Sequence, residues 1–374
     1  MTVKPSLSTG KHCTSKDVAA LAGVSQSAVS RCFTPGASVA KQTRKKVLEA
    51  ASALGYRPNM HARTLITGKT RMIGVVLGHL DNLFYPRFLQ LMAERLQSLD
   101  MQLLLFVADA NRESDLMEKL LAYRVDGIVL AATTLNAELA RACTAAGIPV
   151  VLFNRVPTND LDRAFHSVQT DHESGTAEMT RLLIKNGHTR IAYLAGHTES
   201  PTNQLRELGC RKALRDANLS MFAYGIGNYD GATARDVTRE WFLEGNRLRA
   251  LENCPDAVVA ADDQMALSVL NTLRFELNLN VPEQVSVVGF DDVPQTAWPS
   301  HELTTYSQPL PEMIEEVIRL LSIQLEPGKG QSASTVAGQA VIIPGRLCLR
   351  GSVKLSTDKR NKKITRNRQP SSSV

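Results

Sequence analysis

The first 54 residues carry three runs in which apolar side chains recur every three or four positions, the spacing of an amphipathic helix. In the first run, Thr14 or Ser15 can cap a helix, because either hydroxyl can accept from a free N–H of the first turn. Asp17 stands in that turn, where the helix dipole favours a negative charge. The apolar face comprises Val18, Leu21 and Ala22. The pattern predicts a short helix that ends at Gly23.

A second helix is predicted to follow Ser25, its capping residue. Its apolar side comprises Ala28, Val29 and Cys32, and its opposite side comprises Gln26, Ser27 and Arg31. Gln and Ser can hydrogen-bond base edges, and Arg can bind guanine or a phosphate, so the polar side could enter a DNA groove. The alternative is that these side chains are merely solvated. A third helix is predicted at about residues 41–54, with Val47, Ala51 and Leu54 on its core face.

From residue 72 onward the pattern changes to short, continuous apolar runs separated by helical stretches. Such runs are typical of parallel strands that are buried on both faces. The first set is 72–77, 101–107, 127–131 and 149–153, and the second is 191–195, 257–261 and 285–290. Two sets predict two doubly wound α/β lobes. Because ligands bind beyond the carboxyl ends of such strands, the residues that follow them are candidates for a site.

The net charge of +6 conceals an uneven distribution. Residues 1–71 hold twelve Lys and Arg against two acids, and residues 352–374 hold seven against one. The body between them is acidic, with 24 Lys and Arg against 34 acids. A basic surface attracts phosphate and an acidic one repels it, so nucleic acid is expected at the head.

The six cysteines lack the ligand spacing of a zinc site, which indicates free thiols in a reducing compartment. The first residues contain no apolar run of a signal peptide, and no stretch is long enough to span a membrane. We therefore expect a cytoplasmic protein with no membrane partner and no cofactor.

Several motifs are specific enough to indicate a family: DVAALAGVS, VSR, TRKKVLEAASALGYRPN and HARTLITGKTRMIGVV. Others follow as far as residue 349: VDGIVL, AGIPVV, KNGHTRIAYLAG, AADDQMALSVL and SVVGFDDVPQTAWPSHELTTYSQPL. With these motifs the chain resembles the LacI/GalR family of transcriptional repressors. The resemblance implies an α/β protein with a three-helix, helix-turn-helix head, a hinge helix, and two periplasmic-binding-protein-like lobes built on doubly wound parallel sheets.

We accordingly divide the chain into five parts. They are a disordered extension (1–13), a helix-turn-helix domain (14–58), a hinge helix or linker (59–71), a two-lobed effector-binding and dimerisation domain (72–350) and a disordered basic tail (351–374). The chain is expected to cross between the lobes three times. The first lobe is placed at about 72–171 plus 304–336, and the second at about 172–303 plus 337–350.

The resemblance also implies how DNA is bound. In this family a short helix, here about 59–66, folds when two copies pair over the operator centre, and a leucine, here Leu65, enters the minor groove and bends the duplex. The alternative is that residues 59–71 are only a flexible linker. The DNA contacts that we assign are Thr14, Ser25, Gln26, Ser27, Ser30, Arg31, Asn59, His61, Arg63 and Leu65.

An effector is expected in the cleft between the lobes. Arg206, with Gly209 three residues later, matches the arginine that the family places over the effector, and a guanidinium suits sugar hydroxyls or a carboxylate. Asp262 stands where an asparagine is usual, and an ionised carboxylate there favours a hydroxyl-rich or cationic group. The effector contacts that we assign are Phe84, Asn154, Arg155, Arg206, Tyr229, Asp262 and Asp291. They would bind a sugar, polyol or sugar acid.

Some of these positions have structural interpretations. Phe84 could equally be core between the lobes. Asp263 and Asp292 are interpreted as capping or turn-forming residues. The two Asp-Asp pairs could suggest a metal, but no His or Cys is expected beside them, so we predict no metal site.

The tail has too few apolar residues for the leucine heptads that join dimers into tetramers in some family members, so a homodimer is expected. Its basic residues either add nonspecific DNA affinity or only solubilise the end.

Three classes of function remain. A DNA-binding regulator explains the head, hinge and lobes together, whereas a sugar-transport protein explains only the lobes and would need a signal peptide. An enzyme would need a nucleophile and a base, and the sequence has no nucleophile elbow, P-loop or zincin spacing. We therefore predict a non-enzymatic repressor of a metabolic operon that binds a pseudo-palindromic operator as a dimer and responds to the effector. Binding to duplex DNA separates this class from the other two.

Overall fold

The computed structural model describes residues 13–34, 36–57, 68–78, 82–108, 113–131, 137–155, 164–325 and 338–356. They belong to two compact units, residues 1–70 and 71–374. Asn59, His61, Arg63 and Leu65, together with the rest of the predicted hinge helix, lie outside the described residues.

The first unit contains the three predicted helices of the head. They are α1 (Ser15–Ala22), α2 (Gln26–Cys32) and α3 (Lys41–Ala53). Asp17 accepts hydrogen bonds of 2.8 Å from both the N–H and the O–H of Thr14, and Ser25 Oγ accepts from Ala28 N at 3.2 Å. The core comprises Val18, Ala19, Val29, Cys32, Val47, Ala50 and Ala51. The prediction that Leu21 faces this core is wrong, because the buried side of α1 includes Ala19 and leaves Leu21 56% exposed.

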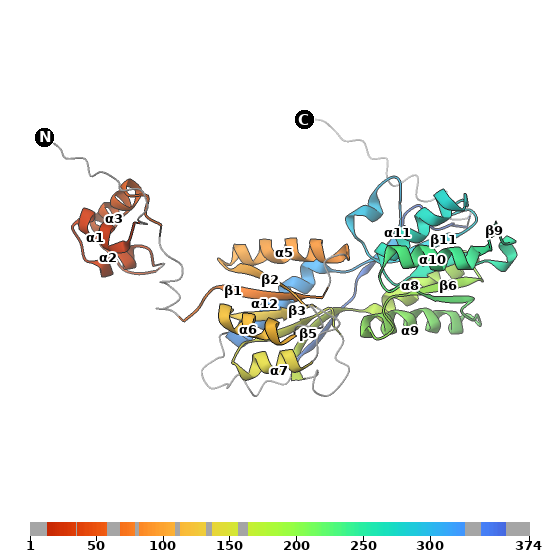
Figure 1. Ribbon diagram of the computed structural model, residues 1–374, viewed down its shortest axis with the longest axis horizontal. Coiled ribbons are helices and arrows are strands. Elements are labelled where there is room, and N and C mark those ends of the chain that lie inside the picture. The colour runs from red at the N-terminus through yellow and green to blue at the C-terminus, as the bar shows by residue number, and fades with distance from the viewer. Residues whose placement is uncertain are drawn as a thin grey trace. The chain divides into compact units, whose positions relative to one another are not determined.

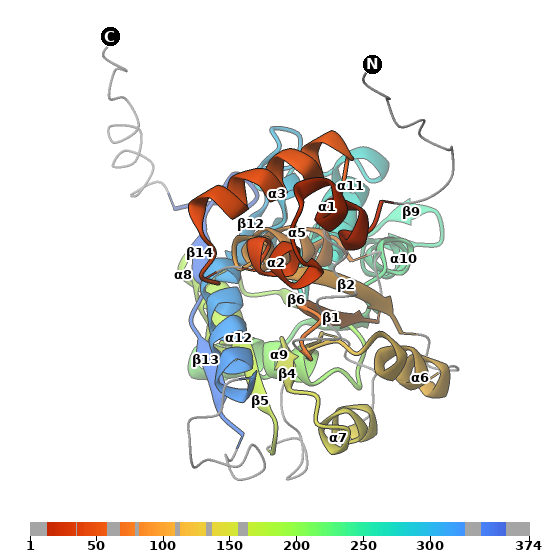
Figure 2. The ribbon, with the colours of Figure 1, turned by 90° about the vertical axis from the view of Figure 1, so that its left-hand side faces the viewer.

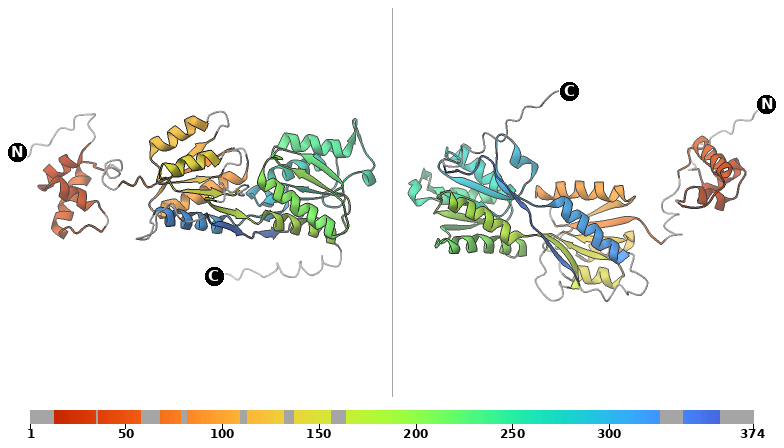
Figure 3. Two further views of the ribbon diagram at one scale, coloured as in Figure 1. Left: turned by 90° about the horizontal axis from the view of Figure 1, so that it is seen from below. Right: turned by 180° about the vertical axis from the view of Figure 1, so that it is seen from behind.

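The second unit contains two six-stranded sheets (Figure 1). The first sheet has the order β13-β5-β4-β3-β1-β2, and all its neighbouring strands are parallel. Its strands are β1 (Met72–Leu77), β2 (Gln102–Val107), β3 (Gly127–Leu130), β4 (Val150–Phe153), β5 (His166–Thr170) and β13 (Ala340–Ile343). One face is covered by α5 (Phe84–Ser98) and α12 (Leu310–Leu325), the other by α6 (Glu113–Tyr123) and α7 (Ala137–Ala145) (Figure 3).

The second sheet has the order β14-β12-β11-β10-β6-β7, in which β14 alone is antiparallel to its neighbour. Its strands are β6 (Ile191–Ala195), β7 (Ala223–Ile226), β10 (Ala257–Ala260), β11 (Ser286–Asp291), β12 (Thr304–Ser307) and β14 (Arg346–Cys348). The helices α8 (His172–Lys185) and α9 (Pro201–Asp216) cover one face, and α10 (Gly231–Phe242) and α11 (Asp263–Asn271) cover the other (Figure 1). The remaining elements are the hairpin β8 (Leu243–Glu244) and β9 (Arg247–Leu248), and short helical turns at Leu251–Asn253, Thr272–Glu276 and Pro294–Ala297.

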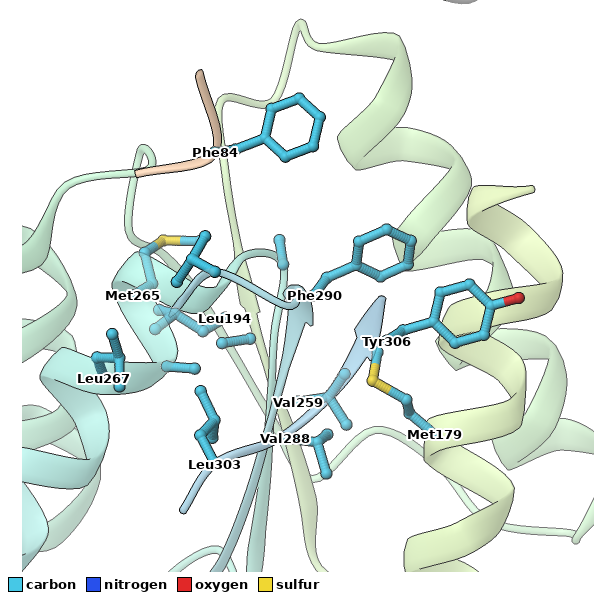
Figure 4. Packing of buried hydrophobic residues seen from close by; sticks show 14 of the residues in the cluster. Phe84, Met179, Leu194, Val259, Met265, Leu267, Val288, Phe290, Leu303 and Tyr306 are labelled. Carbon is cyan, nitrogen blue, oxygen red and sulfur yellow. The ribbon is translucent and has the colours of Figure 1, made fainter. Parts of the chain in front are cut away.

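One continuous hydrophobic cluster links the two sheets. On the first sheet, Phe88 stacks on Phe153 with ring centroids 4.2 Å apart. On the second, the ring centroids of Phe290 and Tyr306 lie 5.2 Å apart near the ends of β11 and β12. Met179 of α8 packs nearby (Figure 4). The polar side chains at the ends of these strands are therefore held in place by a packed hydrophobic core.

The predicted fold class is confirmed, but the limits of the lobes need correction. Residues 304–307 form β12, which pairs with β11 in the second sheet, whereas we had placed them in the first lobe. Residues 340–343 form β13, which pairs with β5 in the first sheet, whereas we had placed them in the second lobe. Between these strands α12 lies against β5 (Figure 2). The pairing of short strands depends on partners distant in the sequence, which local hydrophobicity does not reveal.

All six cysteines are free thiols, as predicted. Within the described ranges, no helix is long and apolar enough to cross a membrane. No three His, Cys, Asp or Glu side chains in the same ranges gather where they could hold a metal ion.

Candidate functional sites

A cavity of about 250 Å³ lies at the carboxyl ends of both sheets. Its lining comes from the segments that follow seven strands, namely β1, β4, β6, β7, β10, β11 and β12, and includes residues of the helices α5, α9 and α11. The described lining residues are Asn82, Phe84, Tyr85, Asn154, His197, Thr202, Arg206, Asn228, Tyr229, Asp230, Gln264, Asp291 and Gln308. This is where ligands bind in doubly wound sheets.

Arg206 of α9 is the charged centre of the cavity, although it is only 4% exposed. Its Nε donates to His172 Nδ1 at 3.2 Å, and one terminal nitrogen lies 3.4 Å from Asp291 Oδ1. The other terminal nitrogen donates to the carbonyl oxygen of Ala261. The guanidinium carbon stands 3.9 Å from the centroid of the Phe290 ring. Three of its five N–H groups are thus engaged by described residues, and two are not.

The glycine of the Arg-x-x-Gly motif explains why Arg206 reaches this position. A Cβ on Gly209 would stand 2.1 Å from the carbonyl oxygen of Glu173, at the start of α8. Only glycine therefore allows α9 to pack this closely against α8, the helix that begins with His172. The glycine of the motif is therefore required for close packing of the two helices, which brings Arg206 into contact with His172.

Three carboxyl groups, those of Asp262, Asp263 and Asp291, are buried in this region. Asp291 accepts a hydrogen bond of 2.6 Å from Gln308 Nε2. Burial raises the pKa of Asp291, and the positive charge of Arg206 offsets only part of that rise. Burial and the Asp291 charge raise the pKa of Asp262 to about 7. Asp263, also buried, accepts from Thr305 Oγ1 at 2.6 Å and from Val293 N at 2.9 Å.

Asp263 and Asp292 have structural partners, as predicted, but neither of them caps a helix. Asp263 joins α11 to the loop after β11 through its two hydrogen bonds. Asp292 forms an ion pair of 2.6 Å with Arg350. The carboxylate that caps α11 is Asp262, whose Oδ1 accepts from Met265 N at 2.9 Å.

Two hydrogen bonds join the loop after β1 to the start of α11 across the cavity. Asn82 Nδ2 donates to Asp262 Oδ2 at 3.2 Å, and Leu83 N donates to Gln264 Oε1 at 3.3 Å. Asn82 and Leu83 follow β1 of the first sheet, whereas Asp262 and Gln264 follow β10 of the second. The two lobes are therefore joined by polar contacts beside the cavity.

Backbone strain gathers at the same strand ends. Tyr229 has φ 57° and Asp291 has φ 122°, and both are non-glycine residues. Such conformations cost of the order of 1–3 kcal/mol each and concentrate at binding sites. A Cβ on Gly196 would stand 2.1 Å from the ring of Tyr229, so this glycine makes room for the ring.

Of the predicted effector contacts, Phe84, Asn154, Arg206, Tyr229 and Asp291 line the cavity. Arg155 and Asp262 are not among its described lining residues. Arg155 is half-buried next to Asn154, and Asp262 lies behind Asn82. Phe84 is also buried in the first lobe, where its ring centroid lies 6.5 Å from that of Phe153.

Sequence reasoning missed several lining residues and one buried neighbour. Asn82 and Tyr85 flank the predicted Phe84, and the rule that sites follow strands could have included them. Gln308, Asn228 and Asp230 follow β12 and β7, two strands that were not predicted. His172 does not line the cavity, but contacts two residues that do.

The candidate DNA-binding face lies on α2 and its cap. Its members are Ser25, Gln26, Ser27, Ser30 and Arg31, all exposed, whereas Val29 and Cys32 on the other side are buried. Gln26 Nε2 donates to Ser15 Oγ at 2.9 Å. Thr14 is exposed, and its hydroxyl donates to Asp17.

The chain is similar to bacterial regulators along most of its length. Residues 14–59 match the family described as bacterial regulatory proteins, lacI family, and residues 180–353 match the periplasmic binding protein-like domain. The chain is 31% identical over 310 residues to the HTH-type transcriptional repressor PurR of Vibrio vulnificus, which covers 79% of this chain and 87% of the relative. It is 29% identical over 344 residues to catabolite control protein A of Priestia megaterium, which covers 90% and 98%.

Solved structures show the same relationship. A structure of the Lac repressor dimer bound to operator and the anti-inducer ONPF aligns with a TM-score of 0.79 and 27% identity, over 92% of this chain and 100% of the other. A complex of the transcriptional regulator CelR with cellobiose aligns with a TM-score of 0.65 and 27% identity, over 91% and 100%.

Proposed function

Since the chain belongs to the lacI family of bacterial regulatory proteins, and is a DNA-binding transcriptional repressor of that family, we propose that it binds a pseudo-palindromic operator as a homodimer under the control of a small hydroxyl-rich effector. The operator would belong to a metabolic operon, and the protein would act in the cytoplasm. A dimer with one recognition helix in each of two major grooves matches the two-fold symmetry of such an operator.

The polar face of α2 supports the DNA part of this proposal. Gln26 and Arg31 are exposed there and can reach base edges, while the Lys and Arg of the head supply phosphate contacts. The relative in the Lac repressor structure is described as a dimer bound to operator. We extend that arrangement to this chain.

The buried Arg206 is the observation that carries the effector part. A buried guanidinium with two N–H groups to spare at a cavity needs a polar ligand to satisfy them. Asp291 neutralises its charge, so neutral sugars and polyols fit better than a sugar acid. The volume of about 250 Å³ lies just below the usual range of ligand pockets, which starts at about 300 Å³, and favours a small molecule.

DNA selection followed by fluorescence anisotropy tests the first part. Duplexes selected from a random pool should contain a pseudo-palindrome, and the protein should bind it more tightly than a scrambled duplex. Log affinity should fall with log salt by about 0.9 for each neutralised phosphate. Equal affinity for the two duplexes at moderate salt would contradict sequence-specific recognition.

A thermal-shift screen tests the second part. Sugars, polyols and sugar acids are added to the purified protein, since a ligand that binds only the folded state raises its Tm. The compound that does so should change operator affinity in the anisotropy assay. Stabilisation without any change in operator affinity would contradict effector control.

A further inference from the structure

His172 occupies an unusual place beside the cavity. It is the first residue of α8, is 1% exposed and lies behind the lining residues. Its Nδ1 accepts from Arg206 Nε at 3.2 Å, and its Nε2 lies 3.0 Å from Asn154 Oδ1. The Phe290 ring covers it, with centroids 5.4 Å apart. His172 therefore connects Asn154, at the end of β4 in the first sheet, with Arg206 on α9 beside the second.

The direction of each hydrogen bond in this chain follows from Arg206. A guanidinium N–H can only donate, so Nδ1 of His172 must carry a lone pair. A neutral imidazole then carries its proton on Nε2. Burial and the positive charge of Arg206 lower the pKa of His172 well below its usual value, which keeps the ring neutral. Nε2–H must donate, so Asn154 presents its carbonyl oxygen to His172.

We propose that His172 is a positioning residue that determines which polar atom Asn154 offers to the effector. Because Oδ1 is bound to His172, the amide group Nδ2 is left for the cavity, and no described residue accepts from it. The end of β4 thus presents a hydrogen-bond donor, and the effector must place an acceptor oxygen there. The part of this inference that concerns the ligand rests on the proposed effector function. The orientation of Asn154 follows from the hydrogen bonds alone.

Imidazole ¹⁵N NMR of the full-length protein tests the orientation. The spectrum of ¹⁵N-histidine-labelled parent is recorded from pH 5.5 to 8, and His172→Gln identifies the His172 signals by their loss. We expect a lone-pair Nδ1, a protonated Nε2 and no titration across this range. A proton on Nδ1, or titration with an ordinary midpoint, would overturn the proposal.

Asn154→Asp provides the second measurement. The new carboxylate would face Nε2–H, favour the charged imidazole, and raise the pKa of His172 by at least about one unit. The control Asn218→Asp adds the same charge at an exposed position and should leave the His172 signals unchanged. If Asn154→Asp leaves these signals at their parent positions at every pH, His172 does not hold residue 154, and the proposal is wrong.

The two proposals fail separately. If no sugar, polyol or sugar acid stabilises the parent, the effector proposal is contradicted, whereas the imidazole spectra still decide the orientation of Asn154.

Discussion

The DNA-binding face and the effector cavity are built in opposite ways. The face on α2 comes from one stretch of seven residues, and its polar side chains are exposed above a core of mostly small residues. The cavity gathers residues from the segments that follow seven strands, and its central charges, Arg206 and Asp291, are both buried.

This difference separates two kinds of sensitivity to mutation. An exposed side chain on a formed helix can change without much effect on folding, because water replaces its lost partners. A buried charge that loses its partner leaves the other charge uncompensated, which costs stability as well as binding. Substitutions in the head should therefore alter recognition alone, and substitutions in the cavity should alter stability and response together.

The largest effect is expected for Arg206→Ala. Among the described residues it removes the only cation in contact with Asp291, and it leaves His172 without its donor, so the free energy of unfolding of the effector lobes should fall by about 3–5 kcal/mol. The effector response should be lost, while the contacts between the helix-turn-helix head and DNA should remain. Denaturant unfolding and operator anisotropy measure the two effects. Arg215→Ala, at an exposed position of the same helix, is the control, and an equal loss there would show that burial is not the cause.

A stabilising effect of the next size is expected for Asp262→Asn. The pKa of Asp262 is raised to about 7 in the folded protein, so folding binds a proton that the unfolded chain releases above about pH 4. Stability is therefore lost as the pH rises from about 4 through 7, and Asp262→Asn should recover about 1–3 kcal/mol at pH 8. Unfolding curves at pH 5 and pH 8 measure the difference.

Asp230→Asn is the matched control for this pH effect. Hydrogen bonds from Thr233 lower the pKa of Asp230, so its replacement should give no gain at pH 8. A gain of the same size for Asp262→Asn at both pH values would contradict the assignment of a raised pKa.

Leu65→Ala should lower specific operator affinity by about 1–3 kcal/mol, by analogy with a mismatched base pair. Leu65 lies outside the described residues, and the prediction rests on its place in the family motif. If its side chain enters the minor groove, the variant should also bend DNA less in a phasing assay, with nonspecific binding intact. Parent-like binding and bending would mean that the hinge is a passive linker.

The smallest effect is expected for Gln26→Ala. It should weaken discrimination between operator and scrambled DNA by about 1–2 kcal/mol, within the range for one bidentate base contact. Unfolding should change little, because the Gln26 bond to Ser15 is exposed. Gln42→Ala, an exposed glutamine on α3, serves as the control for anisotropy. An equal loss of discrimination in both variants would contradict the assignment of α2 as the recognition helix.

The sequence by itself determined the elements whose signal is local. Helical periodicity located α1, α2 and α3, with capping residues for the first two, and seven continuous apolar runs located seven strands of the two sheets. Five of the seven predicted effector residues line the cavity. Asn154 and Asp291 do so because a residue at the end of a buried strand stands at the carboxyl edge of its sheet, whereas Phe84, Arg206 and Tyr229 are assigned from the family resemblance.

The tertiary structure decided whatever depends on partners distant in the chain. It assigned β12 and β13 to their sheets through pairing, and it turned Asp262 from a cavity-lining residue into the cap of α11. It also brought His172 between Asn154 and Arg206 through the close packing that Gly209 permits. A hydrogen bond between residues 18 or 34 positions apart leaves no periodic trace in the sequence, because only folding brings its donor and acceptor together.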